Sequence, residues 1–153
     1  MVSARRDGNR VWYRLASASV AELLHVVREV AFDHSAQVRE AAETYMGGPV
    51  EAIGRAELLT RLERGDVVVV DLRPSREFDA GHLPGAVSIP IDELEARLAD
   101  LPDDAEVVAY CRGRFCAFAH EGVRILHTAG RRAVRLDEGL PEWRLAGLAV
   151  EAS

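Results

Sequence analysis

Four consecutive valines, Val67 to Val70, constrain the fold of this chain more than any other segment. Valine is β-branched and favours extended backbone, and the run contains no polar residue that could face water. Such strands are typical of parallel sheets whose two faces are both covered by helices. The run therefore predicts an α/β fold rather than an antiparallel sheet with one solvent-exposed face.

Strand and helix patterns alternate along the chain from Ile53 onward. The expected strands are residues 67–71, 86–89, 106–110 and 133–136, and the expected helices are residues 55–64, 75–79, 117–128 and 142–146, with a further helix of about eight residues after a cap at Asp92. This alternation predicts a parallel sheet with helices on both faces. In such sheets the chemistry sits at the carboxyl ends of the strands.

The first third of the chain has a different pattern. Residues 1–15 predict a β-hairpin with Asp7-Gly8 at its turn, and Ser19 with Glu22 forms an S-x-x-E capping box at the start of a helix. We expect this single long helix to run to about Met46, where the Gly47-Gly48-Pro49 linker ends it. The sequence thus predicts two parts, a hairpin plus long helix at residues 1–48 and an α/β domain at residues 49–153.

The long helix carries an apolar stripe in which the gaps alternate between four and three residues. Its members are Val20, Leu24, Val27, Ala31, His34, Val38, Ala41 and Tyr45. A 3.5-residue period is the seam of a helix that pairs with another helix, so we expect a homodimer through helix 20–46. The alternative is packing of this helix on the second domain of its own chain.

His25 and His34 lie nine positions apart, which is the wrong spacing for a metal pair on one helix face.

Composition excludes several classes of function. All 19 cationic residues are arginine, so the chain has no lysine for a Schiff base or for a phosphate-binding P-loop. A net charge of −6 does not suit a broad nucleic-acid surface. We find no secretory signal and no apolar run near the roughly 20 residues that span a bilayer, so we expect no membrane association. Two cysteines without a signal suggest a reducing compartment, and we expect a cytoplasmic, bacterial protein.

The segment around Cys111 indicates chemistry. A short apolar strand ends at this cysteine, a loop with Arg112, Gly113 and Arg114 follows, and a helix begins at Ala117. Loop amides and the positive end of the helix dipole would both stabilise a thiolate there. A buried structural cysteine is the alternative, but packing alone gives no reason for two adjacent cations.

Three ordered motifs resemble the rhodanese family over about residues 51–150. The segment from Asp71 to Pro90 is similar to the family's D-x-R…E-[FY]…G-H-[IL]-P-G-A signature, the sequence Tyr110-Cys111-Arg112 stands where rhodaneses carry their sulfur-accepting cysteine, and residues 138–143 resemble the closing G-G-x-x-x-W turn. The resemblance implies a rhodanese-like α/β domain and a sulfurtransferase. Its cysteine would take sulfane sulfur from thiosulfate or a persulfide and pass it to a thiol acceptor, with small molecules as both partners and no cofactor.

The resemblance also implies roles for individual residues. Cys111 would be the catalytic nucleophile, and the substrate-binding loop would comprise Arg112, Gly113, Arg114, Phe115, Cys116 and Ala117. From the residues themselves we expect structural support from Asp71, Arg73, Glu77 and His82, with catalytic acid or base roles as the alternative. Trp143 would anchor the closing turn, and His120 would lie on a solvated helix face, with tuning of the thiol as the alternative. We expect no metal site, since two cysteines without CxxC spacing fall short of a zinc ligand set.

The loop departs from related patterns at two positions. Many rhodaneses carry arginine five places after the cysteine, where this chain has Cys116, and the related phosphatases carry arginine six places after it, where this chain has Ala117. Phosphoryl chemistry is therefore not expected. Cys116 is either a small buried residue at the helix start or a resolving thiol that attacks the Cys111 persulfide, releasing sulfide and leaving a disulfide.

The N-terminal third resembles the wing and dimerisation helix of arsenic-repressor-type (ArsR) winged-helix regulators. Arg5, Arg6 and Arg10 on such a wing can contact phosphates, but the recognition helix that enters the major groove is absent, so we do not expect DNA binding. Two alternatives to the enzyme remain. One is a persulfide or redox sensor, or a sulfur-relay module, that reacts without turnover; the other is a dimerisation fragment with an inert domain.

Overall fold

The computed structural model describes residues 1–153 and divides them into two units, Met1–Glu40 and Ala41–Ser153. The expected boundary after residue 48 lies later in the chain than this division and stays a prediction. Within the second unit, Arg124 Nη2 on a downstream helix donates to the carbonyl oxygens of Met46 (2.6 Å) and Gly48 (2.8 Å). The segment expected to be a linker is therefore anchored to the second unit.

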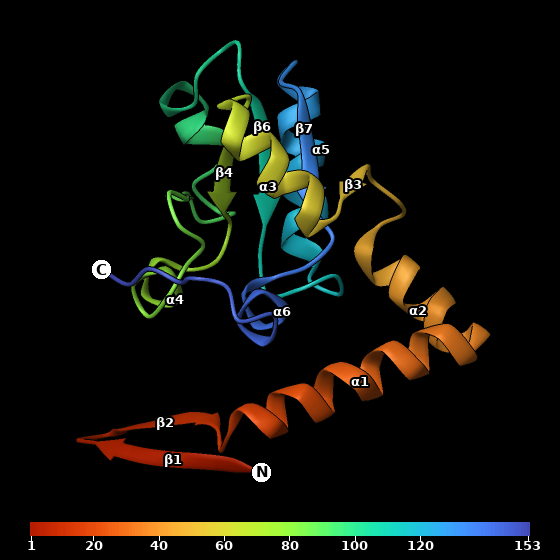
Figure 1. The fold of residues 1–153 in the computed structure, drawn as a ribbon, viewed down its shortest axis with the longest axis vertical. Helices are drawn as coiled ribbons and strands as arrows, with labels where there is room; N and C mark the ends of the chain where they lie inside the picture. Colours follow the sequence, from red (N-terminus) through yellow and green to blue (C-terminus); the bar gives the residue numbers. More distant parts are fainter. The chain divides into compact units, whose positions relative to one another are not determined.

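The first unit begins with an antiparallel hairpin (Figure 1) formed by β1 (Val2–Asp7) and β2 (Arg10–Leu15). Asp7 pairs with Arg10, so the turn residues are Gly8 and Asn9 rather than the expected Asp7 and Gly8. Gly8 has φ +58. A glycine with positive φ at the first turn position matches the right-handed twist of the two strands, and this decides the register.

Ser35 interrupts the expected long helix, which is instead α1 (Ala18–His34) and α2 (Ala36–Met46). The backbone of Ser35 is extended (φ −126, ψ 113), and its N–H donates to the carbonyl oxygen of Ala31. Its Oγ accepts from the N–H of Val38 at 3.3 Å. One serine thus ends α1 and caps α2, because its side chain can replace a helical backbone acceptor.

The start of α1 also differs from the expected capping box at Ser19 and Glu22. Ser17 is the N-cap, with extended backbone and a side chain that accepts from the N–H of Val20. Ser19 lies inside the helix and is not available as a cap. No residue of α1 is buried, and Val27 of the predicted seam is 54% exposed.

The second unit contains a five-stranded sheet of order β3-β7-β6-β4-β5 (Figure 1), and every neighbouring pair is parallel. Its strands are β3 (Ala52–Ile53), β4 (Val67–Asp71), β5 (Val87–Ser88), β6 (Glu106–Tyr110) and β7 (Ala133–Leu136). The valine run is β4, which lies between β6 and β5. This confirms the predicted parallel sheet.

Two apolar cores cover the two faces of the sheet. Val69 and Val108 face a core with Leu58 of α3 (Arg55–Arg64) and Trp143 of α6 (Leu140–Leu145). The alternate positions on the strands pack against α5 (Ala117–Thr128) and η1 (Glu95–Asp100), a 3-10 helix. Helices on both faces are therefore confirmed, and α4 (Ser75–Asp79) follows β4 as expected.

The segment after Asp92 is not the expected helix but a turn followed by η1. Arg97 inside η1 has non-helical φ −110 and ψ 15. Its guanidinium donates to the carbonyl oxygen of Ser88 and to Asp100 Oδ2, at 3.0 and 2.8 Å. These bonds hold the segment in a tighter turn beside β5.

None of the helices is both long and apolar enough to cross a membrane.

Candidate active site

The candidate site is the loop that joins β6 to α5 at the carboxyl end of the sheet. Cys111 directly follows β6 and is 1% exposed, and Cys116 is the N-cap of α5. Between them Gly113 takes φ +131, and its carbonyl oxygen accepts from the N–H of Cys116 at 3.0 Å. The predicted strand 106–110 and helix 117–128 therefore frame the loop as the sequence indicated.

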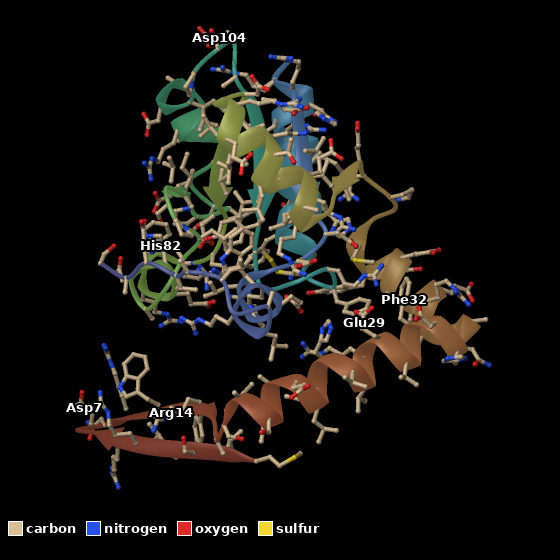
Figure 2. All side chains as sticks on the ribbon, viewed as in Figure 1. Asp7, Arg14, Glu29, Phe32, His82 and Asp104 are labelled. Carbon is tan, nitrogen blue, oxygen red and sulfur yellow. A yellow bond between two sulfur atoms is a disulfide. The ribbon has the colours of Figure 1, made fainter.

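A disulfide joins Cys111 to Cys116 (yellow in Figure 2). Their Cα atoms lie 6.5 Å apart, within the usual span of disulfides. The side chain of Cys116 forms no capping hydrogen bond to α5. Since the first amides of a helix lack internal partners, both sulfur atoms lie where the helix dipole favours an anion.

Arg112 of the loop is paired with Glu77 of α4. Its Nε and Nη2 donate to the two carboxylate oxygens at 3.0 and 2.6 Å, and its guanidinium lies 5.2 Å from the centre of the Phe118 ring. The hydrogen bonds from Arg112 lower the pKa of Glu77. Glu77, expected as loop support, thus holds the first cation of the substrate loop in place.

The acidic residues that follow β7 face the other arginines near the loop. Arg114 Nη2 lies 3.8 Å from Asp137 Oδ2, and Asp137 Oδ1 also accepts from Arg135 at 2.5 Å. Arg55 at the start of α3 pairs with Glu138 at 2.8 Å. Each of these cations therefore has a carboxylate partner, with Asp137 shared between Arg114 and Arg135.

Gly139 and Glu142 position the loop, a role that no sequence pattern assigned to them. A Cβ atom at Gly139 would lie 2.2 Å from the backbone nitrogen of Gly113 and 2.6 Å from the carbonyl oxygen of Cys111. Glu142 accepts from the N–H of Gly139 at 2.9 Å, so α6 begins at residue 140, earlier than expected. The glycine of the closing-turn motif could have indicated a close contact at position 139. Nothing in the sequence indicated that the contact is with the backbone of Gly113 and Cys111.

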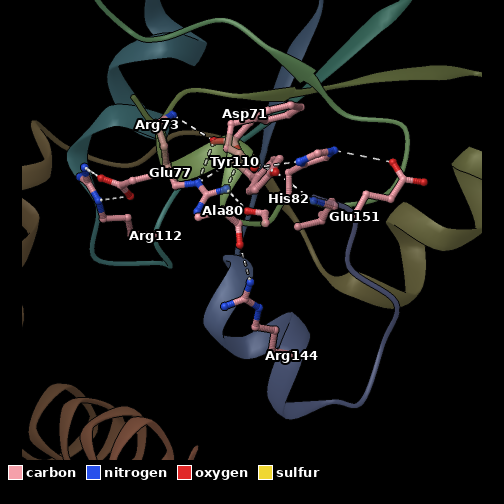
Figure 3. Close-up of polar contacts among 12 residues, drawn as sticks. Asp71, Arg73, Glu77, Ala80, His82, Tyr110, Arg112, Arg144 and Glu151 are labelled. Carbon is pink, nitrogen blue, oxygen red and sulfur yellow. Dashed lines mark hydrogen bonds and ion pairs between the residues drawn. The ribbon is translucent and has the colours of Figure 1, made fainter. Parts of the chain in front are cut away.

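A buried polar network braces the strand ends beside Cys111 (Figure 3). Arg73 donates through Nε and Nη2 to the Asp71 carboxylate, and Tyr110 donates to Asp71 Oδ2 at 2.5 Å. Burial, followed by the charge of Asp71, raises the pKa of Tyr110. Arg73 also donates to the carbonyl oxygen of Gly81 at 2.7 Å. These contacts fit the supporting role predicted for Asp71 and Arg73.

His82 also lies in a supporting position. Its ring stacks on Phe78 with 3.6 Å between ring centroids, and Nδ1 lies 2.9 Å from the carbonyl oxygen of Phe78. Its backbone forms a two-bond bridge with Glu151 near the C-terminus, and its Nε2 lies 3.7 Å from Glu151 Oε2 (Figure 3). Trp143 donates from Nε1 to the carbonyl oxygen of Ala149 at 2.8 Å and is buried, as an anchor of the closing turn should be.

His120 does not lie on a solvated face of its helix, contrary to the sequence-based expectation. It is 3% exposed, and its Nδ1 lies 3.3 Å from the carbonyl oxygen of Cys116. Burial and the positive charge of Arg135 lower its pKa. The 3.6-residue turn of α5 places His120 on the inward face, one turn after Cys116.

A cleft of about 940 Å³ lies at the opposite, amino end of the strands, lined by residues that include Arg61, Glu106 and Arg132. Arg61 is paired with Glu57 and Glu106. This cleft is separate from the cysteine loop.

Within residues 1–153, no three His, Cys, Asp or Glu side chains gather closely enough to hold a metal ion.

Comparison with known proteins gives consistent results. The family model described as "Rhodanese-like domain" matches residues 55–146. An HTH-type transcriptional regulator of Mycobacterium tuberculosis is 53% identical over 99% of this chain, which spans 67% of that relative. A sulfurtransferase of Allochromatium vinosum is 31% identical over 67% of this chain and 96% of its own length.

Two solved structures resemble most of this chain. The BH2092 protein of Bacillus halodurans has a TM-score of 0.63 and 27% identity, covering 74% of this chain and 85% of that one. The thiosulfate sulfurtransferase of Pseudomonas aeruginosa has a TM-score of 0.62 and 28% identity, covering 74% of this chain and 22% of that one.

Proposed function

The chain belongs to the rhodanese-like domain family, and from that premise we propose that it is a sulfurtransferase whose Cys111 carries sulfane sulfur as a persulfide. The observation that carries this proposal is the position of Cys111, at the carboxyl end of β6 and beside the N-terminus of α5. That position stabilises a thiolate, which is the nucleophilic form of cysteine.

The proposed reaction has two displacements at sulfur. After an external thiol has reduced the Cys111–Cys116 disulfide, the Cys111 thiolate attacks the outer sulfur of thiosulfate or of a small persulfide, a sulfur–sulfur bond forms at Cys111, and sulfite or a thiolate leaves. An acceptor thiolate then attacks the outer sulfur of the enzyme persulfide. This step forms the acceptor persulfide and returns Cys111 to its thiolate, so no cofactor or external oxidant is needed.

The residues around Cys111 would have two roles, stabilising the persulfide and orienting the sulfur donor. The first amides of α5, beginning with Ala117, would stabilise negative charge on the persulfide. Arg112 and Arg114 would orient an anionic donor, although each first has to exchange a protein carboxylate for that donor. This competition favours a small persulfide, which carries less negative charge than thiosulfate.

The test is substitution of the nucleophile. We expect Cys111→Ser to abolish sulfur transfer, measured as thiocyanate formed from cyanide with thiosulfate or cysteine persulfide as donor. Cys116→Ser is the matched control, because it removes the other cysteine of the loop while leaving Cys111 able to accept sulfur. Turnover that survives in the Cys111→Ser protein would contradict the assignment.

A second candidate function is a sensor in which Cys111 accepts sulfur once per chain and does not turn over. The regulator from Mycobacterium tuberculosis, 53% identical to this chain, favours it. The two functions differ in stoichiometry. Multiple turnovers with a small thiol acceptor support the enzyme, whereas labelling that stops at one sulfur per chain supports the sensor.

A further inference from the structure

The cysteine loop holds a second sulfur whose position the sulfurtransferase reaction above does not use. Cys111 is fixed by β6, and Cys116 is fixed as the N-cap of α5. The structure joins the two residues across 6.5 Å between their Cα atoms. Because each cysteine is held by a regular element, the two sulfurs meet in the folded protein without a change in either element.

The loop backbone is shaped for this approach. Gly113 takes the positive φ that reverses the chain, and the bond from Cys116 N–H to its carbonyl oxygen closes the turn. Gly139 lacks the side chain that would push the loop away, and Glu142 holds Gly139 by its N–H. The side chain of Cys116 makes no cap to α5, so capping does not explain a cysteine at this position.

The arginine side chains of the loop add little to the stabilisation of a Cys111 persulfide by the α5 amides. Arg112 is engaged by Glu77, and Arg114 faces Asp137. An outer sulfur on Cys111 would therefore meet cations that are already paired, next to a thiol within reach. Under these conditions attack by the neighbouring thiol competes well with transfer to an outside acceptor, since its effective concentration is that of an intramolecular reaction.

We propose that Cys116 is the first acceptor for Cys111 and that the chain reduces sulfane sulfur to sulfide. This inference rests on the proposed function, because it needs a Cys111 persulfide. The Cys116 thiolate attacks Sγ of Cys111, the bond from that Sγ to the outer sulfur breaks, and hydrosulfide leaves with the bonding electrons. The outer sulfur gains two electrons, and the two cysteines lose two as their disulfide forms.

A low-molecular-weight thiol completes the cycle. Two such thiols reduce the Cys111–Cys116 disulfide by exchange and become one disulfide of their own. Each turn then converts one persulfide and two thiols into one thiol, one disulfide and one sulfide. The products of this chemistry are thus free sulfide and a transiently oxidised loop, rather than a persulfide on an outside acceptor.

The test is a single turnover of the full chain, reduced and freed of thiol, with one equivalent of thiosulfate or of cysteine persulfide. For the wild-type protein we expect sulfide release close to one equivalent. Intact mass should fall by two hydrogen atoms, with peptide mapping locating a Cys111–Cys116 link. Blanks without protein correct for sulfide that the donor releases by itself.

Cys116→Ser is the decisive variant, with Cys116→Ala as a second one in case serine disturbs the loop. We expect both variants to gain the mass of one sulfur atom at Cys111 and to release at least tenfold less sulfide until dithiothreitol is added. Wild-type protein that keeps the added sulfur and releases no sulfide would overturn this inference and leave the sulfurtransferase intact. Cys116 variants that gain no sulfur from either donor would overturn the proposed function itself.

Discussion

At the scale of single residues, pairing of charges distinguishes this site from a simple anion-binding loop. Arg112 lies in the loop, but one edge of its guanidinium, Nε and Nη2, donates to both carboxylate oxygens of Glu77, and Arg114 lies near Asp137. A free guanidinium attracts a dianion, whereas one held in a bidentate pair has to lose that partner first. The carboxylates thus limit how strongly the loop binds thiosulfate.

Substitution of Glu77 tests this limit. We expect Glu77→Gln to lower the KM for thiosulfate by about threefold, because exposed ion pairs contribute less than about 1 kcal/mol. Steady-state kinetics with cyanide as acceptor measures the effect. Glu93→Gln, which removes an equal charge beside Arg97 in the turn before η1, is the control and should leave KM unchanged.

The pH dependence of the same pair follows from the lowered pKa of Glu77. The carboxylate stays ionised in the folded protein below the pKa of an unfolded glutamate, so the pair is complete at neutral pH. It is lost only as the pH falls through the lowered pKa. The KM for thiosulfate of the wild-type protein should therefore approach that of Glu77→Gln only in acid, and a KM difference that is already absent at pH 7 would contradict this account.

At the scale of elements, the site depends on α6 as much as on the strand and helix that flank the loop. α6 and the turn before it pass so close to the loop that only glycine fits at position 139. The φ of Gly139 is −129, which any residue adopts, so its role is close approach and not backbone freedom. Placement of the sulfur atoms is thus decided by packing between segments that are distant in sequence.

Gly139→Ala should displace the loop. The new Cβ would fall 2.2 Å from the backbone nitrogen of Gly113, and backbone cannot move aside as a flexible side chain can. We expect sulfur transfer to fall by about a hundredfold, as for a misplacement of about 1 Å, with a loss of about 1–3 kcal/mol in the free energy of unfolding.

Gly54→Ala is the matched control, because a Cβ there meets nothing within 4 Å. Both proteins should show cooperative unfolding in urea. A Gly139→Ala protein with wild-type turnover would show that the loop tolerates the displacement, and the packing argument would then be wrong.

At the scale of the whole molecule, the chain joins a unit with a packed sheet to one whose apolar residues are largely exposed. On α1 the exposed apolar residues include Leu23, Val26, Val27 and Val30, each about half exposed. Apolar side chains at this spacing form one helix face. The predicted homodimer through residues 20–46 would cover part of this face, and we propose it on that ground.

Val27→Glu tests the homodimer. A charge in the predicted seam should shift the protein from dimer to monomer at micromolar concentration, because an unpaired charge is costly to bury. Sedimentation velocity measures the mass. Gln37→Glu adds an equal charge outside the stripe and should leave the dimer intact, while a wild-type protein that is monomeric at all accessible concentrations would contradict the prediction.

The sequence by itself determined the parts of the fold that depend on short-range patterns. The valine run of β4, helix 55–64 with Gly65 after it, and the frame of residues 106–110 and 117–128 around the cysteine loop agree with the structure. Hydrophobic period is a property of a few neighbouring residues, so one sequence is enough to read it. The same holds for the assignment of Cys111 to the end of a strand, although packing against the turn at Gly139 sets the final position of its sulfur.

Only the tertiary structure decided the features that join distant residues. The Arg112–Glu77 pair and the close approach of Gly139 to the loop both fall in this class. Glu77 and Arg112 are separated by 35 residues along the chain. No local pattern encodes such a pair, because the packing of β4, β6 and their helices sets the distance between its members.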